Sequence, residues 1–369
     1  MKKTITKVFC AVLFLTGTFS AFALDVNGTP PTFTGTGSGD FNTAVSTAFG
    51  IALNKVRQEV RDIDSKPDDF IQSWGNSAIF ASHGATQRAY GDYKLFSFTT
   101  GPMIGLQLPG DPFKIANELD NLADKLNRDH DIKLGVSPQI FNARLGINAS
   151  KFLLDKLYLG LHLGFIKLKG DDFGLNGFSY DNFSIGVLAN YQFIPQIKII
   201  PKILLWRGVN FGSGLIYQGT KINYAIKLET YSADITGSGI TGTLSIDPKL
   251  MLDMNINTVT IPLEATTAVK LLSFLNIPVG VGVDLGFGKS DIKIGMKGDV
   301  YVTGNPGTLT QSKPGNVSVD AGGDMAPSFF NLKFMTGVGI NIGPVLLDIP
   351  VTFYAGNGYS VGVTVGIVW

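Results

Sequence analysis

The chain has 369 residues and carries 30 Lys and Arg against 29 Asp and Glu, so its formal net charge is +1. This balance argues against a nucleic-acid partner, because proteins that bind nucleic acid usually carry an excess of basic residues. Hydrophobic residues make up 44% of the chain, and so much apolar surface excludes intrinsic disorder because its burial can offset the entropy of ordering.

The first 23 residues have the pattern of a cleavable export signal. Lys2, Lys3 and Lys7 precede an apolar run over residues 8–15, and small residues at Ala21 and Ala23 fit the specificity of a signal peptidase. The apolar run is too short to cross a bilayer, which takes about 20 residues. We therefore expect residues 1–23 to be a signal peptide that is removed after Ala23.

The cysteine content limits the chemistry of the exported chain. Cys10 is the only cysteine, and it lies inside the predicted signal. The remaining residues therefore offer no disulfide, no thiolate nucleophile and no cysteine-ligated metal site.

Residues 24–92 are predicted to form an N-terminal linker and a helical region. Asp40 can cap a helix from Phe41 to about Asp62, because Val45, Phe49 and other apolar residues recur every three or four positions. The apolar stripe of this helix could plug a barrel, rest on a membrane surface or pair with another chain. We favour a plug or a periplasmic element. A second helix is expected over residues 111–127, where Asp111-Pro112 is a helix-start signal.

From Tyr93 to the last residue, apolar and polar or small residues alternate with a period of two, which predicts β-strands. Twelve such segments can be distinguished: 96–108, 132–149, 157–165, 182–193, 208–218, 222–231, 240–252, 259–271, 277–287, 329–342, 345–355 and 359–369. Each is long enough for a tilted strand to cross a bilayer, for which about 9 to 11 residues suffice. Residues 290–326 also alternate, and are either one long outer loop, which we prefer because glycines and prolines interrupt them, or an additional hairpin.

The character of the two faces indicates a membrane protein. One face of each segment is large and apolar, whereas the other is mostly Gly, Ser, Thr and Asn. A soluble sandwich would place large residues inward and charged residues outward. Because lipid accepts only helices or closed sheets, the fold class predicted is all-β: a closed antiparallel transmembrane β-barrel of about 12 strands, with 10 or 14 as alternatives. Aromatic residues near segment ends could form interfacial girdles: Tyr93, Phe193, Tyr217, Phe330, Tyr354, Tyr359 and Trp369.

Charged residues and one histidine fall on the polar faces, and the register therefore directs them to the lumen: Arg144, His162, Lys227, Glu229, Asp247, Lys249, Glu264, Asp284, Lys333 and Asp348. A basic residue facing lipid would cost about 2 to 4 kcal/mol near the midplane. Acids and bases nearly cancel, so these residues could either line a weakly selective pore or pair with one another and stabilise the barrel.

No catalytic residue, metal site or cofactor is predicted. The three histidines, His83, His130 and His162, lack metal-ligand spacing, and no nucleophile elbow or phosphate-binding loop is present. Two acidic pairs, Asp68-Asp69 and Asp171-Asp172, are better read as solvated turns than as calcium sites, because each supplies too few ligands.

The final segment resembles the C-terminal signature by which bacterial outer-membrane barrels are delivered to their assembly machinery. The residues that carry it are the alternating apolar positions and the terminal aromatic: Tyr359, Val361, Val363, Val365, Ile367 and Trp369. Shorter stretches, Asn76-Ser77-Ala78, Trp206-Arg207-Gly208 and 214–218, are loosely similar to long-chain fatty-acid transporters and to uncharacterised spirochaete barrels. The transporters carry Asn-Pro-Ala where this chain has Ser77 at the central position.

The resemblance implies an outer-membrane location, with residues 93–369 as the barrel. Expected partners are outer-membrane lipid, the barrel-assembly machinery through the last strand, and a small or lipid-like solute. We expect a passive channel or a transporter of small or hydrophobic solutes rather than an enzyme. The alternative is a plugged barrel with a structural or adhesin-like surface role.

Overall fold

The structure is a computed structural model that describes residues 25–61, 67–82, 94–108, 133–174, 176–227, 230–237, 239–305 and 309–369. Several predictions concern residues outside these ranges: the signal peptide, the helix over 111–127, Tyr93, His83, His130 and Glu229. Two longer helices are described, α2 (Ser38–Arg61) and α3 (Pro67–Ala81). Neither is long and apolar enough to cross a membrane, and this holds for every helix in the described ranges.

Most of the chain forms one large antiparallel sheet whose strand pairings close into a ring of 10 strands. Two consecutive short strands make up each of three ring positions: β3 (Phe96–Thr100) with β4 (Met103–Gln107), β5 (Gly135–Gln139) with β6 (Phe141–Asn148), and β18 (Gly358–Gly362) with β19 (Thr364–Val368). Single strands fill the other seven positions: β7 (Leu157–Lys169), β8 (Phe178–Ile194), β10 (Leu204–Lys227), β12 (Ile240–Leu271), β13 (Leu275–Asn305), β16 (Phe330–Ile342) and β17 (Val345–Tyr354).

The ring has fewer strands than the twelve predicted, and matches the smaller alternative of ten. Segments 208–218 and 222–231 fall largely on one continuous strand, β10, and segments 240–252 and 259–271 both lie on β12. The alternation of inward and outward side chains continues through each apparent break. What changes at the break is the polarity of each face.

The ring closes between its first and last strands. β4 pairs with β18, with Gly105 opposite Ser360, and β3 pairs with β19, with Thr99 opposite Gly366. Pro102 separates β3 from β4, which is expected because proline has no backbone N–H to donate to a ladder. Backbone bonds from Lys94 and Leu95 to the carbonyl of Trp369 complete the closure at one end.

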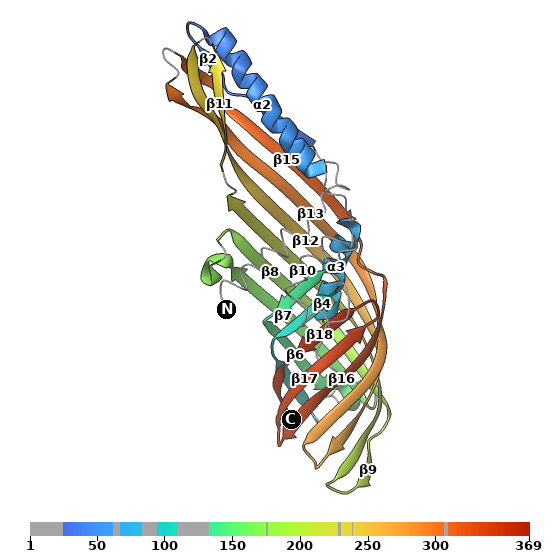
Figure 1. Ribbon diagram of the computed structural model, residues 1–369. Helices are drawn as coiled ribbons and strands as arrows, with labels where there is room; N and C mark the ends of the chain where they lie inside the picture. Colours follow the sequence, from blue (N-terminus) through green and yellow to red (C-terminus); the bar gives the residue numbers. More distant parts are fainter. Residues whose placement is uncertain are drawn as a thin grey trace.

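The two ends of the ring differ. At the end called here the turn end, short connections join the strands, including η3 (Ala149–Lys151), β9 (Ile197–Ile200) and the turns at 272–274 and 343–344. At the opposite end β12 and β13 continue well beyond the other ring strands (Figure 1), and β10 continues from its last pair with β8 at Tyr224 to Lys227. We call this continuation, together with β1 (Asp25–Thr29), β11 (Tyr231–Gly237) and β15 (Gly315–Met325), the extension.

The helix predicted from Phe41 is α2, but it does not lie inside the ring. It packs along one face of the extension, where Phe41, Val45 and Phe49 join a buried cluster with Leu244 and Val300 (Figure 1). Its apolar stripe covers only one side of the helix, so it suits the flat apolar face of a sheet rather than an enclosed position. A small two-stranded sheet of β2 (Thr32–Thr34) and β14 (Thr310–Lys313) lies beside the N-terminal end of α2.

Residues 290–326 do not form the long loop that the glycines and prolines suggested. β13 continues through this region to Asn305, and β15 pairs with it from Met325 at Ser290 to Gly315 at Val300. On its other edge, β15 pairs with β1, which supplies a partner strand from the start of the described chain. The pairing of β13 with β15 is the hairpin that the alternation of residues 290–326 left open as an alternative, whereas the pairing with β1, which is distant in sequence, could not be predicted from local pattern.

Candidate functional site

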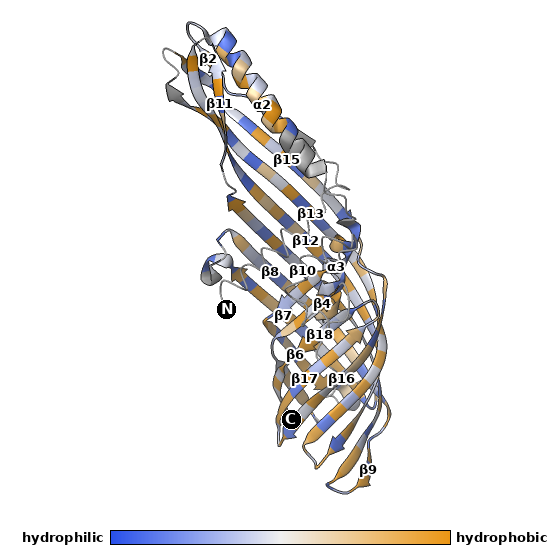
Figure 2. Ribbon diagram, viewed as in Figure 1, coloured by the Kyte–Doolittle hydropathy of each residue, from blue (hydrophilic) through white to orange (hydrophobic). Residues whose placement is uncertain are grey.

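The ring carries its apolar side chains on the outside. On β13, the outward residues from Ile277 to Phe287 are Ile, Val, Val, Val, Leu and Phe, and Val281 is 56% exposed. The same holds for Leu161 and Leu163 on β7 and for Leu332 and Phe334 on β16. Figure 2 shows these hydrophobic positions concentrated on the ring. A soluble protein rarely exposes a continuous apolar surface of this extent.

This apolar belt ends at a common level on neighbouring strands. Moving toward the extension, the outward side chains change from apolar to polar or charged: Phe165 to Lys167 on β7, Phe183 to Asp181 on β8, Tyr217 to Lys221 on β10, Val259 to Asp253 on β12 and Phe287 to Lys289 on β13. The register supports a shared boundary, because Phe165 is opposite Phe183, and Lys167 is opposite Asp181 at an ion-pair distance of 3.7 Å.

The inward faces change in the opposite sense at the same level. Along β13, the inward residues inside the ring include Asn276 and Asp284, whereas those inside the extension include Ile292 and Val300, which are buried. The ring is thus apolar outside and polar inside, and the extension is polar outside and apolar inside. A sheet surrounded by lipid turns apolar side chains outward, and a sheet surrounded by water turns polar side chains outward. This inversion therefore marks where the sheet leaves an apolar environment.

Helix α3 lies inside the extension end of the ring. It contacts strands from opposite sides of the ring, including β4, β5, β12, β13 and β18. From Ser73 to Ser82 every side chain is buried. Glycines make room for it: a Cβ added at Gly105 would lie 2.2 Å from the Ser77 carbonyl oxygen, and one at Gly135 would lie 2.1 Å from that of Ser73.

Both apolar and polar contacts hold α3. Phe70, Ile71 and Trp74 belong to a core cluster with Ile222 and Ile256 of the surrounding strands. The polar contacts join the helix to strands and connections on different sides. Asn76 donates from Nδ2 to Ser328 Oγ at 3.1 Å and accepts at Oδ1 from the Ser328 backbone N–H at 2.7 Å, and Ser82 Oγ lies 3.4 Å from Thr260 Oγ1.

The sequence contained a signal for this helix that the prediction did not use. Pro67 followed by Asp68 and Asp69 is a typical first helical turn, since proline tolerates the first position and acids suit the positive end of the helix dipole. The interpretation of Asp68-Asp69 as a solvated turn was therefore wrong, and Asn76-Ser77-Ala78 lies within the helix. Asp171 does lie in a short turn, the 3₁₀-helix η4 (Gly170–Phe173).

An ionic cluster lies in the ring interior next to α3. Lys333 on β16 donates from Nζ to Glu264 on β12 and, at 2.6 Å, to Asp284 on β13. Tyr354 on β17 donates its hydroxyl to Asp284 at 2.9 Å. The Tyr354 ring stacks on Phe80 of α3 with 3.9 Å between centroids. The cluster thereby links four strand positions of the ring to the helix.

The interior continues as a network of polar residues, most of them uncharged. His162 Nε2 lies 2.9 Å from Ser184 Oγ, and Gln139 donates to Gln218 at 2.8 Å across the ring. Nearer the turn end, Arg207 donates to Asn276 at 3.1 Å, and Asn276 donates to Asn341 at 2.8 Å. Hydrogen bonds between side chains of different strands thus cross the interior of the ring.

The structure places six of the predicted lumen residues inside the ring, all of them buried: Arg144, His162, Glu264, Asp284, Lys333 and Asp348. Of these, Glu264, Asp284 and Lys333 contact one another, and His162 and Arg144 are opposite each other on β7 and β6. Glu229 lies outside the described residues. Tyr354, predicted for an interfacial girdle, points inward instead, whereas Phe193, Tyr217, Phe330 and Trp369 are exposed on the outside.

Lys227, Asp247 and Lys249 are not in the lumen. They lie on the outward face of the extension, beyond the apolar belt. The prediction placed them inside because it assumed that lipid surrounds every segment, and a charge facing lipid is costly. Outside the belt the outward face meets water, so charge there carries no such penalty. Among the described residues, no group of His, Cys, Asp and Glu could hold a metal ion.

Comparison with solved structures returns outer-membrane β-barrels at low sequence identity. The transport unit of the autotransporter AIDA-I from Escherichia coli aligns with a TM-score of 0.35 and 10% identity, covering 83% of this chain and 99% of the other. The translocator domain of the autotransporter NalP from Neisseria meningitidis has a TM-score of 0.27 and 9% identity, with 75% and 89% covered. The CymD monoaromatic hydrocarbon channel has a TM-score of 0.24 and 9% identity, with 80% and 98% covered.

The comparison with curated proteins returns no match. A family model described as Lsa36-like matches residues 31–369, which is nearly the whole chain. The chain therefore belongs to the Lsa36-like family.

Proposed function

We propose that this protein is an outer-membrane β-barrel that passes small or hydrophobic solutes only when α3 leaves the ring. The observation that carries the proposal is the polarity inversion along β12 and β13, with apolar side chains outward in the ring and charged side chains outward in the extension. Residues 277–287 of β13 span about 36 Å at roughly 3.3 Å per residue. At a tilt of about 45° this corresponds to about 25 Å, the height of the apolar band in such barrels.

In this proposal, lipid contacts the outward residues of the ring, and the exposed residues of the last strand deliver the chain to the barrel-assembly machinery. Val365 and Ile367 are exposed on that strand, as such a role requires. The closed state is held by the contacts of α3 with Thr260, Ser328 and Tyr354. Conduction therefore depends on breaking them.

A reversible disulfide between α3 and the ring tests the gating step. Ser82 Oγ and Thr260 Oγ1 are 3.4 Å apart, and the only native cysteine is Cys10. We would replace Cys10 by serine, introduce S82C/T260C and record conductance in planar bilayers under oxidising and reducing conditions. The expected result is silence when the disulfide is formed and conductance steps when it is reduced, with S82C alone insensitive to reductant.

Two outcomes contradict this function. Equal conductance in the oxidised and reduced states would show that α3 does not control passage. Silence of the wild-type and reduced proteins under all conditions, in preparations whose insertion is confirmed by protease protection, would remove the transport function.

A second candidate function is a plugged barrel that anchors a surface domain. It is favoured by the extension, which projects beyond the belt and has its own apolar core under α2. Strands β11, β14 and β15 all lie in this region. Protease added to intact cells should cut within the extension and leave a protected ring fragment. Cutting only after permeabilisation would place the extension inside the cell and exclude this role.

A further inference from the structure

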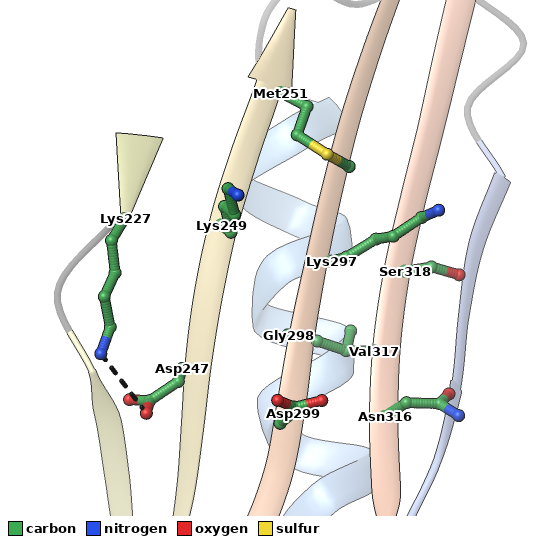
Figure 3. Close-up of a pocket in the computed structure, with 10 residues that line it drawn as sticks. All are labelled: Lys227, Asp247, Lys249, Met251, Lys297, Gly298, Asp299, Asn316, Val317 and Ser318. Carbon is green, nitrogen blue, oxygen red and sulfur yellow. Dashed lines mark ion pairs between the residues drawn. The ribbon is translucent and has the colours of Figure 1, made fainter. Parts of the chain in front are cut away.

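The outward face of the extension carries a row of three lysines on neighbouring strands. Lys227 on β10 is directly opposite Lys249 on β12, and Lys249 is directly opposite Lys297 on β13. In Figure 3 all three lie on the face of the sheet away from α2. Like charges directly opposite one another destabilise a sheet, so this row needs a compensating negative charge.

The protein itself compensates only one of the three lysines. Lys227 Nζ lies 3.6 Å from Asp247 Oδ2. A hydrogen bond from the Thr230 hydroxyl is the main cause that holds the pKa of Asp247 below its ordinary value, and Lys227 adds to it. Within the described ranges, neither Lys249 nor Lys297 has a carboxylate within ion-pair distance. Among the residues that the structure describes, these two adjacent positive charges therefore have no acidic partner.

These two lysines line a hollow of about 850 Å³. The volume falls within the range of small-molecule sites, about 300 to 1,000 Å³. Met251 forms an apolar part of the wall, and Asp299, Asn316 and Ser318 supply hydrogen-bonding groups next to Lys297 (Figure 3). The hollow thus combines three lysines, of which Lys227 is paired with Asp247, with neutral polar groups and the carboxylates of Asp247 and Asp299.

We propose that this hollow binds an acidic oligosaccharide. A sugar carboxylate or sulfate would lie between Lys249 and Lys297. Neighbouring sugar hydroxyls would exchange hydrogen bonds with Asn316 and Ser318 and donate to Asp299. A hydroxyl-rich ligand with isolated acidic groups matches this mixture of donors, acceptors and positive charge better than a uniformly charged ligand does.

The surroundings argue against two other anionic ligands. Asp247 and Asp299 flank one side of the lysine row and Asp320 the other, so a long polyanion such as a nucleic acid would meet repulsion on both sides. A lipid headgroup of the same membrane is out of reach. Lys249 is 257 − 249 = 8 residues beyond Asn257 at the belt edge, or about 26 Å of strand at roughly 3.3 Å per residue, which is about 19 Å of height at a tilt of about 45°. Headgroup regions are only about 5 to 8 Å thick on each side.

The inference uses the outward exposure of the extension that the second candidate function requires, but its test uses purified full-length protein in detergent. Binding of a hyaluronan hexasaccharide, an unsulfated chondroitin hexasaccharide and neutral maltohexaose would be measured by isothermal titration calorimetry, because the first two carry one isolated carboxylate per disaccharide. Both acidic sugars should bind and maltohexaose should not. K249Q/K297Q should weaken acidic-sugar binding at least tenfold. The matched control is K293Q, because Lys293 is exposed on the same face of β13 but lies outside the hollow.

Three results would overturn the proposal. The first is an equal loss in K293Q and K249Q/K297Q, which would indicate diffuse surface charge. The second is binding of maltohexaose as tightly as the acidic sugars. The third is complete displacement of the acidic sugar by inorganic sulfate at the same concentration as the sugar, which would leave no role for the sugar hydroxyls. Circular dichroism melting confirms that each variant is folded. None of these results depends on conduction or on cellular orientation, so a failure here is distinguishable from a failure of either function above.

Discussion

Lys333 places a positive charge between two carboxylates in the interior of the ring. Its side chain is fully buried, as is Asp284, and Glu264 is nearly so. Burying an ion pair gives little net stability, because desolvation opposes the attraction, but removing one partner leaves an uncompensated buried charge. The three residues are therefore interdependent.

Replacing Lys333 with methionine should lower the free energy of unfolding by about 3 to 5 kcal/mol, because Glu264 and Asp284 lose their shared cation. Urea unfolding in detergent, followed by tryptophan fluorescence, measures the change. The control is K289M, which removes an exposed lysine 2.7 Å from Asp291 and should change stability little because solvent screens that pair. K333M/E264Q/D284N should recover part of the loss. An equal effect of K333M and K289M would contradict the interpretation of the cluster.

The position of helix α3 depends on glycines in the surrounding strands, which leave room for the helix backbone. Gly105 is a sensitive position, because a Cβ there would lie 2.2 Å from the Ser77 carbonyl oxygen and 2.6 Å from the Ala81 nitrogen. Both atoms belong to the helix backbone, so they cannot move aside as a flexible side chain can. The small residues on the inward face of the strands thus determine where the helix fits.

G105A should displace α3 and lower the free energy of unfolding by about 1 to 3 kcal/mol, the usual cost of overpacking. It should also increase conductance if the helix closes the ring. Thermal unfolding and bilayer recordings measure the two effects. G50A in α2 is the control, since an added Cβ there meets nothing within 4 Å and alanine favours a helix. Unchanged stability of G105A would mean that α3 sits less tightly than these contacts indicate.

The elements differ in how far the sequence predicted them. The stripe of Phe41, Val45 and Phe49 correctly indicated α2, but a stripe does not reveal which apolar surface it will cover. Helix α3 was missed although Phe70, Trp74 and Ala78 recur at helical spacing. Its polar residues Ser73, Asn76 and Ser77 are buried as well, and a sequence pattern alone does not predict a helix enclosed on all sides. The ring strands were predicted well where one face is consistently apolar, as on β19. They were divided incorrectly where the faces exchange polarity, as near Asn257 of β12.

At the scale of the whole molecule, a substitution by lysine should be costly on the outward face of the ring and nearly neutral on the outward face of the extension. Val281 is 56% exposed on the apolar belt, whereas Asn255 is exposed on the outward face of the extension. The sequence alone could not define this boundary, because it emerges only when the strands are aligned and Phe165, Phe183 and Phe287 fall near one level.

V281K should lower the free energy of unfolding in lipid vesicles by about 2 to 4 kcal/mol, because a lysine near the membrane midplane must be desolvated. N255K should leave stability nearly unchanged, since its side chain meets water. Urea titration of vesicle-folded protein, followed by the shift in gel mobility on heating, measures both. Equal destabilisation by the two substitutions would contradict the position of the belt.

The pairing of β3 and β4 with β18 and β19 also constrains how the protein is made. This seam joins an early part of the chain to a late one. The ring of hydrogen-bonded strands can therefore close only after β19 has been synthesised. Helix α3, which lies inside the extension end of the ring, precedes β3 in the chain and is available long before then. Wrapping the strands around a pre-positioned α3 spares residues 67–82 a later insertion into an interior crowded by side chains such as Gln139 and Gln218. Biogenesis would then proceed from the centre outward, with the seam as its final step.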